Sequence, residues 1–354
     1  MSPAEALANT LLHLVNIESV SGNEGTLTDF FVREMRAVGL HPAKRARDWA
    51  LFKPEPSGKP VVLLAGHSDT VPAQGNLPGH LEGEWVRGLG ASDMKAGLAV
   101  MLELARALGS MSEASVEPWF LLFGQEEMAL EASLLPKIFA ACPFLSEVDL
   151  VLMMEPTANT IQAGCLGNII ARLEFDGVAA HSARPWLGKN AIHEAVRGLQ
   201  ALAGAEIRDA QVGGLTFREV VSVTTIQGGV ADNVVPDHVI AGVNFRYAPD
   251  RTPAEAKARL RELAGADGRL TIVSNAPPAP VAVANPLLGR LREIGGMALE
   301  PKQAWTPVAE FAQAGHDAVN YGPGDPALAH RRDERVAVSA LSESLAVLRR
   351  FISA

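Results

Sequence analysis

Five side chains of the kinds that bind divalent metals stand at the ends of apolar stretches or in the loops between them: His67, Asp93, Glu127, Glu155 and His330. Two imidazoles and three carboxylates are enough for two divalent ions if one carboxylate bridges them. Mixed nitrogen and oxygen ligands favour zinc, and cobalt or manganese can substitute. Glu126 is a spare acid beside this set, and a carboxylate next to a metal site can act as a general base. The set predicts metal-dependent hydrolysis of an amide.

Three short apolar runs position most of these side chains: Val61–Ala65, Trp119–Phe123 and Val148–Met154. Such runs are typical of central parallel strands, and ligands bind at the carboxyl ends of these strands. His67 follows the first run, Glu126 and Glu127 follow the second, and Glu155 follows the third. Asp93 begins a predicted helix over 94–108, where the helix dipole stabilises a negative charge. A solvated turn explains any one of these residues alone, but their common placement favours a single site.

The hydrophobic period changes after residue 165, where half-exposed strands and helices follow in the order β-α-β-β-α-β, as in a split βαβ sandwich. The strands are expected over 169–175, 220–226, 239–247 and 270–274, and the helices over 191–202 and 253–263. We therefore predict an α/β domain over 1–164 and 278–354, with a mixed, mainly parallel sheet flanked by helices, and an inserted α+β domain over 165–277. Further helices are expected over 3–17, 24–38 and 335–352, and an edge strand within 43–60.

Composition argues against several other classes of protein. The formal net charge of the 354 residues is −9, whereas binding to nucleic acid or to an anionic membrane needs a basic face. No apolar run approaches the length of a membrane span. Cys142 and Cys165 do not make a disulfide framework, and the N-terminal segment has the pattern of an amphipathic helix rather than of a signal peptide. We therefore expect a cytoplasmic protein.

Five motifs resemble those of the co-catalytic zinc aminoacylase and carboxypeptidase family: His67-Ser-Asp69-Thr-Val-Pro72, Gly90-Ala-Ser-Asp93-Met-Lys-Ala-Gly97, Glu126-Glu127, Glu155-Pro-Thr157 and His330-Arg-Arg-Asp333-Glu334. They follow the family's order and span nearly the whole chain. The resemblance implies that His67 and Glu155 hold one zinc ion. It implies that Glu127 and His330 hold a second, and that Asp93 bridges the two.

The same resemblance assigns supporting roles. Asp69 would orient His67, as carboxylates behind metal-binding histidines do. Glu126 would be the general base, and the peptide bond between Asp93 and Met94 would be cis. The family also implies a homodimer that forms through the inserted domain.

Asn233 and Arg246 match the family's substrate-binding positions, and the segment around His181 resembles a family segment of the dimerisation domain. Arg184 and Thr306 are further candidates for binding the substrate. His181 would reach the partner's active site and stabilise the oxyanion of the tetrahedral intermediate. Arg184 and Arg246 would bind substrate carboxylates, with Asn233 and Thr306 as hydrogen-bond partners. From residue type alone, His181 would be a surface-loop histidine and Arg246 the solvated end of a strand.

The substrate expected is a small N-acyl amino acid. Ala180-His181-Ser-Ala-Arg184 and Ala304-Trp305-Thr306 resemble the desuccinylase members of the family, which remove a succinyl group from an amino-dicarboxylate. Pro307 and Glu310 depart from the family pattern, so deacetylation of N-acetyl-ornithine, N-acetyl-lysine or N-acetyl-citrulline and dipeptide cleavage stay open. A non-catalytic binding module is the alternative from another class.

Overall fold

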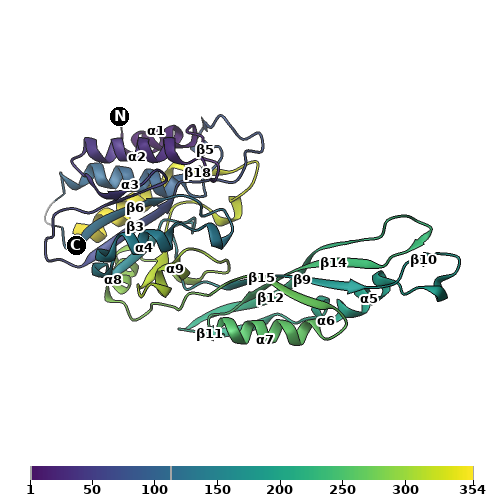
Figure 1. The fold of residues 1–354 in the computed structure, drawn as a ribbon. Helices are drawn as coiled ribbons and strands as arrows, with labels where there is room; N and C mark the ends of the chain where they lie inside the picture. The colour runs from purple at the N-terminus through teal and green to yellow at the C-terminus, as the bar shows by residue number, and fades with distance from the viewer. Residues whose placement is uncertain (1, 112–113, 354) are drawn as a thin grey trace. The chain divides into compact units, whose positions relative to one another are not determined.

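The computed structural model describes residues 2–111 and 114–353 (Figure 1). The chain forms two compact units. The first unit comprises Met1–Ala163, Ala282–Glu300 and Glu310–Ala354, and the second comprises Gly164–Val281 and Pro301–Ala309. The second unit thus takes in a short segment, 301–309, that lies apart from the rest of that unit in the sequence.

An eight-stranded sheet forms the centre of the first unit, with the strand order β1-β2-β6-β3-β7-β17-β8-β16. Its strands are β1 (Pro42–Arg45), β2 (Trp49–Phe52), β3 (Val61–His67), β6 (Glu117–Phe123), β7 (Leu150–Met153), β8 (Ile161–Ala163), β16 (Leu299–Pro301) and β17 (Ala318–Asn320). The four central strands, β6, β3, β7 and β17, run parallel. All residues of β3 are buried, as expected for an apolar strand covered on both faces. The mixed sheet with a parallel centre is confirmed.

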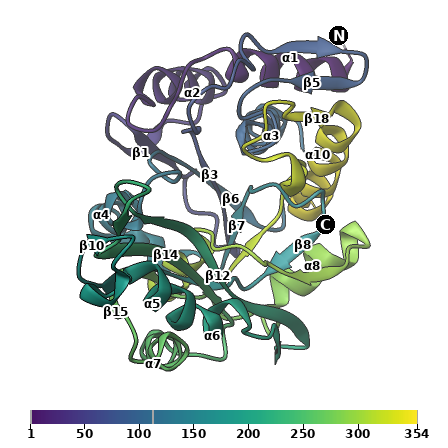
Figure 2. The ribbon, with the colours of Figure 1, turned by 90° about the vertical axis from the view of Figure 1, so that its right-hand side faces the viewer.

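Helices cover this sheet, and α1, α3 and α10 pack on one another (Figure 2). The helices outside 164–281 are α1 (Pro3–Val15), α2 (Gly25–Ala37), α3 (Lys95–Leu108), α4 (Leu135–Ala141), α8 (Pro286–Gly295), α9 (Val308–Gln313) and α10 (Val338–Ser353). A capping box between Ser2 and Glu5 begins α1, and Leu7, Leu11 and Leu14 bury its apolar stripe.

One expectation for the first unit is confirmed with an addition, and another is wrong in detail. The edge strand expected within 43–60 is β1, and a second strand, β2, lies fully buried between β1 and β6. The helix expected from residue 335 begins at Val338, because Arg335–Ala337 forms β18. This strand pairs with β5 (Trp85–Arg87), which also pairs with β4 (His80–Glu82). Tertiary pairing here overrides the helical pattern of the local sequence.

The second unit is a five-stranded sheet, in the order β11-β12-β14-β9-β15, with helices on one face (Figure 1). Its main elements are β9 (Gly167–Asp176), α5 (Ala191–Gly198), α6 (Gln200–Ala203), β11 (Arg208–Val212), β12 (Leu215–Gly228), β14 (His238–Tyr247), α7 (Pro253–Ala264) and β15 (Arg269–Ala276). The expected order of strands and helices is present, with β11 and the short strands β10 (Ala180–His181) and β13 (Val234–Val235) added and the first helix divided at Leu199. Within residues 2–111 and 114–353, no helix combines the length and apolar character that a membrane span requires.

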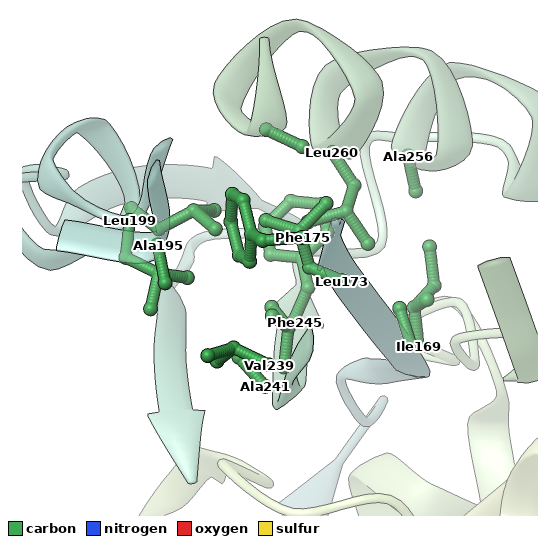
Figure 3. Packing of buried hydrophobic residues seen from close by; sticks show 14 of the residues in the cluster. Ile169, Leu173, Phe175, Ala195, Leu199, Val239, Ala241, Phe245, Ala256 and Leu260 are labelled. Carbon is green, nitrogen blue, oxygen red and sulfur yellow. The ribbon is translucent and has the colours of Figure 1, made fainter. Parts of the chain in front are cut away.

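Alternate residues of the central strands build the core of the second unit (Figure 3). Phe175 and Leu173 of β9 and Phe245 of β14 point toward Leu260 of α7 and Ala195 of α5. Because side chains in a strand alternate between faces, the other face of the same strands stays half exposed.

Candidate metal centre

Asp93 lies between two histidines of the first unit. One carboxylate oxygen of Asp93 is 3.2 Å from Nε2 of His67, and the other is 3.6 Å from Nε2 of His330. The His67 ring is also 3.8 Å from a carboxylate oxygen of Glu155, and the His330 ring is 2.8 Å from one of Glu127. The structure therefore brings all five ligand candidates together in two groups that share Asp93.

The strand ends explain how residues far apart in sequence meet. His67 ends β3 and pairs with Phe123, the last residue of β6, so Glu126 and Glu127 leave the sheet at the same edge. Glu155 follows the neighbouring strand β7. Asp93 precedes α3, and the peptide bond between Asp93 and Met94 is cis, as the family resemblance implies. His330 comes from a loop near the chain's end and has a left-handed φ of 61°.

Asp69 ties two parts of the centre to each other through backbone hydrogen bonds. Its carboxylate, fully buried, accepts from the N–H of Glu126 at 3.0 Å and of Glu127 at 2.9 Å, and from the Ser21 hydroxyl at 2.8 Å. One oxygen is 3.5 Å from Nδ1 of His67, whose Nδ1 also lies 3.0 Å from the Asp69 carbonyl oxygen. Asp69 thus contacts His67, as expected, and holds the turn that carries the two glutamates, which was not expected.

The charges of the centre act strongly on one another. Burial, reinforced by the negative charges of Glu155 and Glu127, raises the pKa of Glu126 well above its usual value, against the opposing effect of His67. Its Oε2 lies 4.0 Å from the His67 ring. The hydrogen bond from His330 to Glu127 raises the pKa of His330 to about 9. Carboxylates crowded around two imidazoles fit divalent cations, because such cations offset the mutual repulsion of the acids.

The remaining candidates lie in the second unit and form two local groups. His181 is on the short strand β10 (Ala180–His181), and the backbone N–H of Ser182 donates to the carbonyl of Asn233, so these two candidates are neighbours. Arg184 follows, and His181, Arg184 and Asn233 are all exposed.

Arg246 and Thr306 make the second group, around the buried Cys165. Nε of Arg246 donates to Asn244 Oδ1 at 3.0 Å, and burial lowers the pKa of Arg246 while the Cys165 thiol opposes that effect. The carbonyl oxygen of Thr306 lies 3.9 Å from the Cys165 sulfur. The Thr306 hydroxyl is buried and has no hydrogen-bond partner among the described residues.

Glu24 supports the centre and was not anticipated from the sequence. This fully buried side chain accepts from the backbone N–H of Gly22 at 2.7 Å and of Gln125 at 3.1 Å. Gln125 has a left-handed φ of 63°, and a side chain at Gly124 would meet Glu24 at 2.9 Å. Glu24 therefore holds the turn that leads into Glu126. A Glu just before an amphipathic helix is common, so the sequence gives no distinctive signal for it.

Glu310, which departs from the family pattern, lies buried in α9 and hydrogen-bonds Ser133. Burial raises its pKa to about 7 from 4.5. The folded state therefore binds a proton that the unfolded state has lost between these values, so stability falls as pH rises from about 4.5 to 7. Because glutamine does not titrate, we expect Glu310→Gln to reduce the loss of unfolding free energy over this pH range by up to about 3 kcal/mol.

Urea denaturation of both proteins at pH 5 and pH 8 measures the effect of Glu310→Gln. The free energy of unfolding of the variant, relative to that of the unmodified protein, should be higher at pH 8 than at pH 5. Glu147→Gln, the same change at an exposed position, is the control and should leave the pH dependence unaltered. Equal pH dependence in Glu310→Gln and the unmodified protein would contradict the prediction.

Comparisons with known proteins identify the family of this chain. A family model described as a peptidase dimerisation domain matches residues 166–270, and one described as peptidase family M28 matches residues 50–163. A DapE protein of Mycobacterium tuberculosis is 38% identical over 341 residues, which are 96% of this chain and 96% of that protein. The succinyl-diaminopimelate desuccinylase of Corynebacterium glutamicum is 34% identical over 96% of this chain and 94% of its own length.

The fold is shared with solved peptidase structures. An M20 family metallo-carboxypeptidase from Sulfolobus solfataricus superposes with a TM-score of 0.79 at 17% identity, covering 100% of this chain and 99% of that chain. The family expected from the motifs is confirmed, as is a metal-dependent hydrolase as the class of enzyme. The chain belongs to the succinyl-diaminopimelate desuccinylase family of metal-dependent hydrolases.

Proposed function

We propose that the protein uses two zinc ions to remove the acyl group from an N-acyl amino acid, with N-succinyl-L,L-diaminopimelate as the substrate and succinate and diaminopimelate as the products. The observation that carries this proposal is the placement of the Asp93 carboxylate between the rings of His67 and His330. The substrate is taken from the relative in Corynebacterium glutamicum, which is named for this reaction and matches over nearly its whole length.

The ligand groups suggest how two ions would be held. His67 and Glu155 would bind one ion, Glu127 and His330 the other, and Asp93 would bind both. Two nitrogen and several oxygen donors suit zinc, with cobalt or manganese able to replace it. When bound, such ions polarise a carbonyl oxygen and lower the pKa of water.

Glu126 forms a possible ligand group with His67 and Glu127, but it belongs to neither of the two groups that contain Asp93, so we assign it to proton transfer. We assign it as the general base that accepts a proton from the attacking water as the new C–O bond forms. Glu126 then returns this proton to the amide nitrogen as the C–N bond breaks, so that the amine leaves neutral. Burial raises the pKa of Glu126 above that of an ordinary carboxylate, which makes it a stronger proton acceptor.

Residues of the second unit would recognise the substrate. Arg246 makes no ion pair within the described residues, and its guanidinium is partly removed from water. Such a group favours an anionic ligand, so Arg246 is assigned to a substrate carboxylate. Arg184, an exposed cation of the same unit, is assigned to a second carboxylate on the resemblance of its motif. Asn233 and Thr306 would donate or accept hydrogen bonds. His181 is assigned to the oxyanion of the tetrahedral intermediate, on the resemblance of its motif.

An activity assay tests the proposed function. The purified protein, loaded with zinc or cobalt, should hydrolyse N-succinyl-L,L-diaminopimelate faster than N-acetyl-ornithine, N-acetyl-lysine or a dipeptide. Hydrolysis should stop when a chelator removes the metal and return when zinc is restored. Preference for an acetylated amino acid would favour the deacetylase alternative. Saturable binding of every compound without turnover would favour a binding module and contradict the proposal.

We also propose that the protein is a homodimer formed through the second unit, whose sequence matches the dimerisation-domain model. Ile192 and Val196 lie one turn apart on the outer side of α5, with 38% and 66% of their surfaces exposed. Trp186 is 75% exposed in the same unit. Large apolar side chains grouped at a surface are typical of protein interfaces.

Val196→Glu should therefore shift the protein from dimer to monomer, because a charge would have to be buried at the interface. Light scattering coupled to size-exclusion chromatography measures the mass of each species. Leu81→Glu places the same charge at a 52% exposed leucine of the first unit and should leave the mass unchanged. A dimer that forms equally well with Glu at position 196 would place the interface elsewhere.

A further inference from the structure

Glu334 is a buried acid that is neither a ligand candidate nor the base. Only 2% of its surface is exposed. One oxygen of its carboxylate accepts from the backbone N–H groups of Ser92 and Asp93, and the other accepts from that of Gly90, each at 2.9 Å. A single carboxylate thus binds three backbone donors from one short loop.

That loop ends at Asp93, the residue whose two oxygens face His67 and His330. The N–H of Asp93 is one of the three donors, so Glu334 fixes the backbone from which the Asp93 carboxylate extends. Burial raises the pKa of Glu334 to about 7, and the three N–H donors oppose that rise because they bind the ionised form more strongly. A second contact joins the same two loops, because the Ser92 hydroxyl donates to the Asp325 carbonyl at 2.8 Å.

We propose that Glu334 is the residue that positions Asp93 between the two metal ions. This inference rests on the proposed function, because a bridging role for Asp93 requires two ions. Glu334 follows His330 by four residues, so one loop supplies a ligand candidate of one ion and the support for the group shared by both. Displacement of Asp93 would weaken the binding of both ions. Loss of a ligand that holds only one ion would weaken mainly the binding of that ion.

Glu334→Gln tests the proposal. The amide keeps one acceptor oxygen, and its NH2 group would face a backbone N–H, so the three hydrogen bonds cannot all form. We expect the affinity for Zn²⁺, titrated against a competing chelator, to fall by about 10- to 100-fold at both sites, as is typical when a group supporting a metal ligand is lost. The electronic spectrum of the Co²⁺-loaded protein should change as well, because it reports ligand geometry directly.

Glu117→Gln is the matched control. Glu117 is also buried, and it accepts from the N–H and hydroxyl of Ser57 and from the indole N–H of Trp119. It begins β6, whereas the metal centre lies beyond the last residue of that strand. Its variant should lose stability to denaturant without any change in Zn²⁺ affinity or Co²⁺ spectrum.

Glu334→Asp separates positioning from charge. Aspartate keeps the negative charge, which opposes the burial-driven fall in the pKa of Lys95, but it is one methylene too short to reach all three donors. It should lose metal affinity as Glu334→Gln does, and it serves as the test if that variant does not fold. Wild-type affinity in either variant would overturn the proposal. An unmodified protein that binds fewer than two ions would overturn the proposed function with it.

Discussion

Glu126→Gln should bind two metal ions like the unmodified protein and hydrolyse its substrate about 10²- to 10⁴-fold more slowly. Glutamine has nearly the same size as glutamate, so the packing of the turn changes little. The backbone N–H of residue 126 would still donate to Asp69. What is lost is the basic oxygen that accepts the proton of the water and returns it to the amine. The loss should fall on kcat, with little change in KM.

Steady-state kinetics, together with elemental analysis of the metal content, measures both parts of the prediction. Glu131→Gln, an exposed position a few residues along the same loop, is the control and should keep full activity. Loss of activity together with loss of metal would make Glu126 a ligand rather than the base. Turnover at the wild-type rate would exclude Glu126 from proton transfer altogether.

Most of the ligand candidates could be predicted because they follow a strong local pattern. His67, Glu127 and Glu155 follow short apolar runs that are typical of central parallel strands, and parallel strands end at one edge of a sheet. Strand type and chain order therefore limit where these side chains can lie. No regular periodic element leads into the loop of His330, so this candidate depended on its residue type and on the resemblance of its motif.

The supporting residues could not be predicted, because their partners are backbone groups. Glu24 binds the N–H of Gln125, and Glu334 binds three N–H groups of the loop before α3. A backbone donor is the same at every position, so residue type does not indicate where an acidic side chain will find one. Hydrophobic patterns likewise missed β18, whose pairing with β5 depends on a segment about 250 residues earlier in the chain.

The second large effect is expected for Asp69→Asn, a change outside the ligands that should lower both turnover and metal affinity. Both carboxylate oxygens of Asp69 accept backbone N–H groups, from Glu126 and Glu127, and one also accepts the Ser21 hydroxyl. An asparagine NH2 group would have to face one of these donors in a fully buried site. A buried donor left without an acceptor costs about 1–3 kcal/mol, so the turn should shift rather than keep its geometry.

That shift reaches the base, one ligand and the orientation of His67 at the same time, which no single ligand change does. We therefore expect Asp69→Asn to lower kcat by about 10² or more and to weaken metal binding by about 10- to 100-fold. Asp149→Asn is the control, because Asp149 accepts the N–H of Val61 at the other end of β3, away from the metal centre. Kinetics and Zn²⁺ titration of both variants distinguish the roles. If Asp69 served only to orient His67, excess Zn²⁺ would restore full turnover, whereas a displaced Glu126 leaves turnover low even when both ions are bound.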